Sequence, residues 1–338
     1  MDERTSEQLL ATLQAETGCR DLRYDGEPAV LTGGFYAEMV RFRLADPPPS
    51  LDGDVVARIV PSAIAGAWEA TIQRGVAAQG FPTPAVRLVA PETGPLGRFL
   101  IVMDLVDGHP PLGGLGAATV VRQVPTLLRH LPDQLASMAA ALHQLDATPV
   151  AGALAELTGD IPTTTAGFVA VQAFQADAAG RRDLVDVAES LLTHEPAAGA
   201  SVIAHGDLHP FNVLITEAGP VLIDWTVARV ADPGFTLGFT DLMLNNPPIA
   251  LPGPAAAALR AAGRTIARRF HATYRRLAPD HLHVDGARLD WHRQVHALRI
   301  LVELATWDAA GARPTSGHPW LVLEPVAHRL LGLSPPNG

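Results

Sequence analysis

The segment that most constrains the fold is HGDLHPFN at positions 205–212, in which six of the eight residues are polar or turn-forming. A short apolar run at 201–204 precedes it. Two more apolar runs, Val213–Ile215 and Val221–Ile223, follow it and are joined by the turn sequence TEAGP. Short apolar runs bounded by turn residues are typical of buried β-strands. The pattern therefore predicts a strand, a polar loop and a β-hairpin, which return the chain to the same point.

Three oxygen-bearing side chains fall on this predicted strand, loop and hairpin. Asp207 and Asn212 lie in the loop and Asp224 follows the hairpin. Hard cations such as Mg²⁺ prefer oxygen ligands together with substrate phosphates, so Asn212 and Asp224 are the candidate metal ligands. Asp207 is the candidate catalytic residue, because its carboxylate can accept the proton of an attacking hydroxyl and orient it toward phosphorus.

At these residues the sequence resembles the aminoglycoside phosphotransferase family, the small-molecule relatives of protein kinases. HGDLHPFN followed by LIDW is similar to the catalytic loop and metal-binding segment of that family, and the D-x-x-x-x-N spacing is that of the protein-kinase loop. The resemblance covers residues 28–245. It implies an α+β fold of the two-lobed protein-kinase type, with a small β-rich N-terminal lobe and a larger, mainly helical C-terminal lobe.

Hydrophobic patterning along the chain agrees with this division. Before residue 110 it predicts helices at 3–16 and 64–79, and strands at 29–31, 37–44, 54–60, 85–90 and 99–106. Beyond residue 110 it predicts helices at 131–145, 182–193, 254–277, 286–310 and 319–332. We expect residues 1–108 to form the nucleotide-binding lobe, which ends in the hinge. Residues 109–338 are expected to form the helical lobe with the catalytic loop and the acceptor site.

All 25 basic residues are arginine. The absence of lysine excludes a Schiff-base lysine and a Walker A phosphate loop. It also leaves Arg58, in the strand DVVARIV, at the position of the family's phosphate-binding lysine. Arginine can hold phosphate oxygens bidentately, but its broader guanidinium needs a partner, and Glu69 on the following helix is the candidate.

The resemblance implies further nucleotide-binding residues on both sides of Arg58. The sequence LTGGFYAE is similar to the family's nucleotide loop, which assigns Gly33, Gly34 and Phe35 to the triphosphate. The stretch FLIVMDLVDG is similar to the hinge between the lobes. Met103 is then expected to border the adenine pocket, with the backbone of Asp104 and Val106 bonding the base.

Other residues of the site have supporting roles. We expect His205 to hold the loop through backbone bonds, and His209 either to do the same or to bond near the acceptor. Where the family commonly has an Asp that braces the loop, this chain has Thr236, with Asp241 as a candidate substitute. The polar residues of the long C-terminal helix, Glu303 among them, are expected to belong to the core and the helix surface.

These observations favour an ATP- or GTP-dependent O-phosphotransferase that uses Mg²⁺ and acts on a hydroxylated small molecule, an antibiotic such as an aminoglycoside or macrolide among the candidates. Two alternatives stay open: a nucleotide-binding pseudokinase, and a zinc-dependent hydrolase with His205, Asp207 and His209 as ligands. The net charge of -10 argues against a nucleic-acid partner. The single cysteine, the charged N-terminal stretch and the lack of a membrane-spanning run predict a cytoplasmic protein. The patterns do not specify the oligomeric state.

Overall fold

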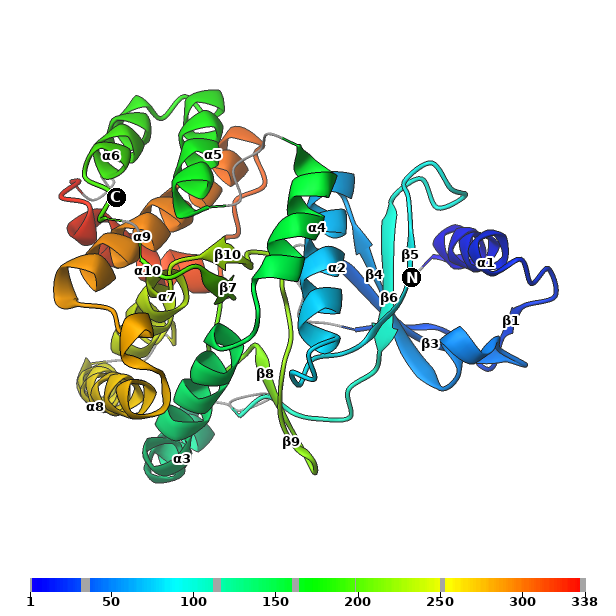
Figure 1. Cartoon of the computed structure of the whole chain (residues 1–338), viewed down its shortest axis with the longest axis horizontal. Coiled ribbons are helices and arrows are strands. Elements are labelled where there is room, and N and C mark those ends of the chain that lie inside the picture. The colour runs from blue at the N-terminus through cyan, green and yellow to red at the C-terminus, as the bar shows by residue number, and fades with distance from the viewer. Residues whose placement is uncertain are drawn as a thin grey trace. The chain divides into compact units, whose positions relative to one another are not determined.

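The computed structural model of the chain describes residues 2–31, 37–111, 117–159, 164–197, 199–249 and 253–334. The chain divides into two compact units (Figure 1). The first comprises Met1–His109, Gly152–Gly159 and Leu214–Val227, and the second comprises Pro110–Ala151, Asp160–Val213 and Ala228–Gly338. The first unit thus takes in two short segments from much later in the sequence.

The first unit is built on an antiparallel sheet. Its described strands are β1 (Arg23–Tyr24), β2 (Ala29–Val30), β3 (Glu38–Ala45), β4 (Asp54–Val60), β5 (Val86–Ala90) and β6 (Phe99–Asp104). They are ordered β1-β3-β4-β6-β5, and β2 also pairs with β3. The expected pairing of residues 29–31 with 37–44 is therefore present. The Gly33–Gly34 turn and Phe35 lie outside the described residues.

The two faces of this sheet carry different cores. Helix α1 (Glu3–Thr17) covers one face and α2 (Ala63–Ala77) covers the other (Figure 1). Alternate residues of a strand point to opposite faces. In β4 this rule sends Val55, Ala57 and Ile59 toward α1, and Val56 and Val60 toward α2. Arg58 has the same parity as Val56 and Val60, so its side chain projects to the α2 face, where Glu69 lies.

The second unit is mainly helical. Its described helices are α3 (Ala117–His143), α5 (Thr165–Ala178), α6 (Arg182–Thr193), α7 (Gly234–Asn245), α8 (Gly253–Leu277), α9 (Gly286–Ala309) and α10 (Pro319–Leu330). Helix α7 is buried from Gly234 to Leu244 and packs against both α8 and α9. Strands β7 (Val202–Ala204) and β10 (Arg229–Ala231) pair antiparallel beside it.

The predicted hairpin is formed by β8 (Val213–Thr216) and β9 (Gly219–Leu222). The predicted fold class, an antiparallel sheet region followed by a mainly helical part, is confirmed. Elements that were not predicted include β1, α4 (Thr148–Thr158), β10 and α7. Helix α7 escapes pattern analysis because it is buried on all sides, so its sequence GFTLGFTDLMLN has no polar face. Among the described residues, no helix combines the length and apolarity that a membrane span requires.

Candidate active site

The loop that follows β7 is held by buried backbone bonds. His205 is fully buried, and its backbone N–H donates to Oγ1 of Thr236 at 2.9 Å. Gly206 has a φ of 71°, and an added Cβ there would lie 2.3 Å from the Phe235 ring. Only glycine meets both conditions without strain. The loop therefore leaves the strand in one defined direction, set by α7.

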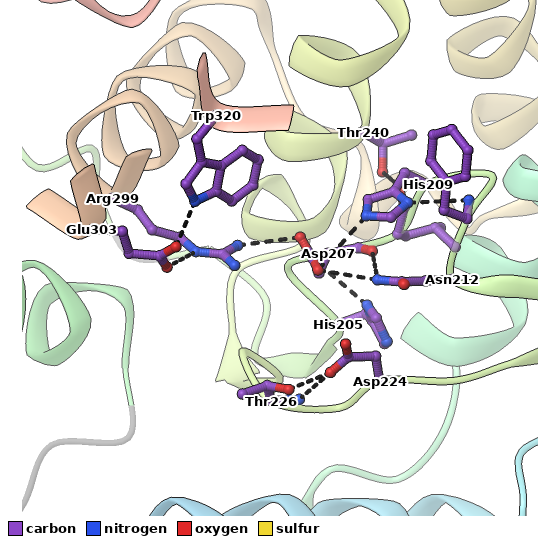
Figure 2. A network of polar contacts seen from close by, with 12 residues as sticks. His205, Asp207, His209, Asn212, Asp224, Thr226, Thr240, Arg299, Glu303 and Trp320 are labelled. Carbon is purple, nitrogen blue, oxygen red and sulfur yellow. Dashed lines mark hydrogen bonds and ion pairs between the residues drawn. The ribbon is translucent and has the colours of Figure 1, made fainter. Parts of the chain in front are cut away.

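Asp207 lies at the centre of a polar network in the second unit (Figure 2). Its backbone N–H donates to Nδ1 of His205 at 3.2 Å. Its carboxylate Oδ2 accepts a bond from Nδ2 of Asn212 at 3.0 Å, and Oδ1 accepts one from Nη1 of Arg299 at 3.2 Å. Nε2 of His209 lies 3.7 Å from Oδ2. Both carboxylate oxygens therefore have a fixed donor.

The orientation of the Asn212 amide follows from its bonds to Asp207. Nδ2 of Asn212 donates to both the backbone carbonyl and Oδ2 of Asp207, each at 3.0 Å. The backbone N–H of Asn212 donates to the carbonyl of His209 at 3.0 Å. Because the amide nitrogen is committed to Asp207, the amide oxygen Oδ1 points away from that carboxylate and is the atom that can ligate a cation.

Arg58 forms the charged centre of the first unit. Its Nε lies 2.9 Å from Oε1 of Glu69, and its Nη2 donates to Oγ1 of Thr226 at 3.0 Å and to Oδ1 of Asp224 at 3.4 Å. The side chains of Arg58 and Glu69 are both nearly inaccessible to solvent. The guanidinium of Arg58 is therefore paired with Glu69 at Nε and with Asp224 at Nη2.

Burial raises the pKa of Glu69 to about 7, an effect that the Arg58 charge opposes and the Asp224 charge reinforces. Asp224 itself has a φ of 65°, an uncommon backbone conformation for a residue with a side chain. Its Oδ1 accepts bonds from the backbone N–H and the hydroxyl of Thr226. Such a conformation persists where the surrounding contacts enforce it, and it is frequent at functional sites.

The predicted hinge residues lie at the end of β6. Met103 is buried, and its sulfur accepts a bond from Nε2 of Gln73 at 3.8 Å. The backbone N–H of Asp104 donates to the carbonyl of Ala85 at 3.1 Å, and its carboxylate pairs with Arg87. The backbone N–H of Asp104 is therefore already engaged within the sheet unit. Val106 is half-buried and follows the strand.

Support for the loop at 205–212 comes from two threonines of α7. Thr236 accepts the bond from His205, and Oγ1 of Thr240 donates to the carbonyl of Leu208 at 2.8 Å. Thr236 therefore braces the loop itself. The suggestion that Asp241 substitutes for the missing bracing Asp is wrong, because its carboxylate is engaged by His271 and Arg293, each at 2.7 Å.

The described part of the chain does not form the zinc site that the hydrolase interpretation requires. There, no three His, Cys, Asp or Glu side chains are placed to hold a metal ion together. Nδ1 of His205 already accepts the backbone N–H of Asp207, and Nδ1 of His209 accepts that of Phe211. The two histidines therefore use these nitrogens to hold the loop.

Residues of α9 and α10 were missed by the sequence reasoning. Arg299 bonds Asp207, Glu303 bonds Arg299, and Trp320 bonds Glu303 (Figure 2). The available signal was an arginine and a glutamate four residues apart in the otherwise apolar stretch LRILVELA. Charges in such a stretch must be paired with one another or with a site. Their partner in the loop lies about ninety residues away in sequence, beyond the reach of local patterns.

The family is identified by comparison with known proteins. The model of the phosphotransferase enzyme family matches residues 30–279, and the chain belongs to that family. The resemblance seen in the motifs and the expected enzyme class, a small-molecule kinase, are confirmed. The curated protein YcbJ of Bacillus subtilis, described as uncharacterized, is 57% identical over 37 residues, which are 10% of this chain and 12% of YcbJ.

Solved structures with the same fold cover nearly the whole chain. A macrolide 2'-phosphotransferase type I is 18% identical with a TM-score of 0.55, covering 98% of both chains. A choline/ethanolamine kinase family protein from Mesorhizobium loti is 16% identical with a TM-score of 0.55, covering 97% of this chain and 94% of its own. The aminoglycoside phosphotransferase APH(3'')-Id from Streptomyces rimosus, solved with ADP and streptomycin, is 18% identical with a TM-score of 0.53, covering 88% and 99%.

Proposed function

We propose that this chain moves the γ-phosphoryl group of ATP or GTP to a hydroxyl of a small molecule, with Asp207 as the catalytic residue. The observation that carries the proposal is the Asp207 carboxylate, which is held at Oδ1 by Arg299 and at Oδ2 by Asn212. A carboxylate fixed at both oxygens is prepared to orient one hydroxyl. Phosphoryl transfer depends mostly on such positioning, since the protein contributes little covalent chemistry.

Asn212 and Asp224 are the proposed ligands of Mg²⁺. An amide oxygen turned away from Asp207 and a carboxylate supply the hard oxygen donors that Mg²⁺ prefers, and triphosphate oxygens and water complete its shell. When bound, Mg²⁺ neutralises charge on the phosphates. The bonds that Thr226 and Arg58 donate to Oδ1 of Asp224 hold that carboxylate in place.

Arg58 is proposed to steady the phosphates in place of lysine. Its ion pair with Glu69 fixes the guanidinium in the sheet unit, while Nη2 faces Asp224 and Thr226. Gly33, Gly34 and Phe35 are proposed to cover the triphosphate. Met103, the carbonyl of Asp104 and the backbone of Val106 are proposed to receive the base.

The acceptor is proposed to be a hydroxylated antibiotic or amino alcohol, and the protein to act in the cytoplasm. Structures of the same fold are named for macrolide, aminoglycoside and choline or ethanolamine phosphorylation, and one was solved with streptomycin and ADP. The net charge of -10 favours a cationic compound among these.

A panel of macrolides, aminoglycosides, sugars and amino alcohols, incubated with Mg-ATP or Mg-GTP and scored by the mass gain of one phosphoryl group, tests the proposal. Transfer to a panel member that disappears in Asp207→Asn supports it. Thermal stabilisation by Mg-ATP without transfer and without slow ATP hydrolysis would identify a pseudokinase instead. Zinc that survives dialysis, together with hydrolase activity, would identify the hydrolase.

A further inference from the structure

A charged side chain far along the sequence contacts the proposed catalytic carboxylate. Arg299 lies in α9 and its Nη1 donates to Oδ1 of Asp207 at 3.2 Å (Figure 2). The match to the phosphotransferase family model ends at residue 279, twenty residues before it. The contact is therefore made by a part of this chain that the family model does not describe.

Arg299 is itself held by two C-terminal helices. Its Nε donates to Oε1 of Glu303 at 2.9 Å, one helical turn further along α9. The indole Nε1–H of Trp320, in α10, donates to the other oxygen of Glu303. The guanidinium carbon lies 5.3 Å from the Trp320 ring centroid and 5.4 Å from that of Phe239, within the range of cation–π attraction. These contacts leave the guanidinium little freedom to rotate.

The charge of Arg299 is retained in this buried position. The side chain is 8% exposed, and a buried charge is tolerated only when it is paired. Burial alone would lower the pKa of Arg299, but Glu303 and Asp207 together raise it above its ordinary value. The loop at 205–212 contains no arginine. Among the described residues, Arg299 is thus the guanidinium bonded to the Asp207 carboxylate.

We propose that Arg299 is a positioning residue for Asp207, and that Glu303 and Trp320 set its orientation. Arg299 holds Oδ1 while Asn212 holds Oδ2, and two donors at separate oxygens fix the plane of the carboxylate. The inference rests on the proposed function, in which that plane aligns the acceptor hydroxyl. A displacement of about 1 Å at a reacting group costs about 100-fold in rate, so loss of one donor is sufficient to slow turnover.

The test compares variants of the full chain for turnover and for nucleotide affinity. Turnover is measured as phosphate release from Mg-ATP with water as the acceptor, and affinity by titration with Mg-ATP. We expect Arg299→Met to lower kcat by about 100-fold while the Kd for Mg-ATP changes less than about twofold. Arg299→Lys restores part of kcat because it keeps the charge. Glu303→Gln removes a more distant contact and is expected to lower kcat less than Arg299→Met does. Trp320→Phe is expected to lower kcat less than Glu303→Gln.

Arg293→Met is the matched control, because Arg293 also lies in α9 and also forms an ion pair with a buried aspartate, Asp241, with Nε 2.7 Å from Oδ2. We expect it to lower stability and to leave kcat within about twofold of the parent. Unchanged kcat in a folded Arg299→Met variant, or an equal loss in the control, overturns the proposal. If Arg299→Met does not fold, the milder variants Arg299→Lys, Glu303→Gln and Trp320→Phe decide in the same way.

A second measurement does not depend on turnover. Amide hydrogen exchange across residues 205–212 reports how firmly the loop is held. We expect faster exchange in this loop in Arg299→Met than in Arg293→Met. The exchange rate in Arg299→Lys is expected to lie between those of Arg299→Met and the parent chain. Equal protection in all of these proteins overturns the positioning role. If the proposed function is wrong, Asp207→Asn keeps the parental turnover, or the parent transfers no phosphoryl group. In that case the hydrogen-exchange result still decides whether Arg299 holds the loop.

Discussion

Replacing Arg58 with methionine removes the charge that limits the rise in the pKa of Glu69. Burial raises the pKa of Glu69 to about 7, against an ordinary value of 4.5, although Arg58 opposes that rise. A carboxyl whose folded pKa is raised contributes stability at low pH that is lost as the pH rises from 4.5 to 7. Above pH 7 the parent protein has lost this proton, and its stability stops falling on this account.

The variant behaves differently above pH 7. Without Arg58, the folded-state pKa of Glu69 rises further, so the folded variant keeps a proton that unfolding releases. Its stability then continues to fall above pH 7 relative to the parent, by up to about 1.4 kcal/mol per pH unit, until the pH reaches the raised pKa of Glu69. Below pH 7 both proteins carry Glu69 protonated, and the difference between them stays constant.

Hydrogen exchange of β4 and α2 at pH 6, 7 and 8.5, corrected for intrinsic exchange rates, measures this local stability in the full chain. The double variant Arg58→Met/Glu69→Gln is the control, because it lacks the titrating group and is expected to show no widening gap. A difference between parent and Arg58→Met that is the same at pH 6 and pH 8.5 would refute the reasoning.

Three further outcomes are expected. Arg58→Lys keeps substantial phosphoryl transfer, since the charge beside the phosphates survives; complete inactivity would mean that the pocket requires the guanidinium. Thr236→Val leaves the buried N–H of His205 without its acceptor, which costs about 1–3 kcal/mol and speeds exchange in the loop; unchanged exchange would contradict the bracing role. Burial lowers the pKa of His143 to about 3, so as the pH falls below 6.5 the unfolded chain takes up the proton first, which costs the parent about 1 kcal/mol of stability per pH unit. In His143→Phe we expect this loss of stability toward acid pH to be smaller. Urea unfolding from pH 4.5 to 6.5 measures the slope of stability against pH, and an unchanged slope would contradict the expectation.

Much of the sheet unit was predictable from sequence because its strands alternate or run apolar between turn residues. The parity of Arg58 with Val56 and Val60 even indicates the face on which its partner lies. The loop at 205–212 was predictable for a related reason, since its polar residues interrupt apolar strands at a spacing that the chemistry requires.

The rest depends on contacts between distant segments. Helix α7 has no polar face to reveal its period, because neighbouring helices bury it completely. The assignment of Asp241 failed because two basic side chains from α8 and α9 already engage its carboxylate. Arg299 reaches Asp207 across 92 residues, and nothing in either local sequence specifies that pairing.

Asp207 is proposed to align a hydroxyl for phosphoryl transfer, and a comparison of the parent with Asp207→Asn tests this role most directly. Asparagine keeps the size of the side chain and removes the proton acceptor. With a panel acceptor and Mg-ATP, we predict a loss of kcat of about 100-fold or more, with the Kd for Mg-ATP nearly unchanged. An Asp207→Asn variant that retains parental kcat would contradict the account.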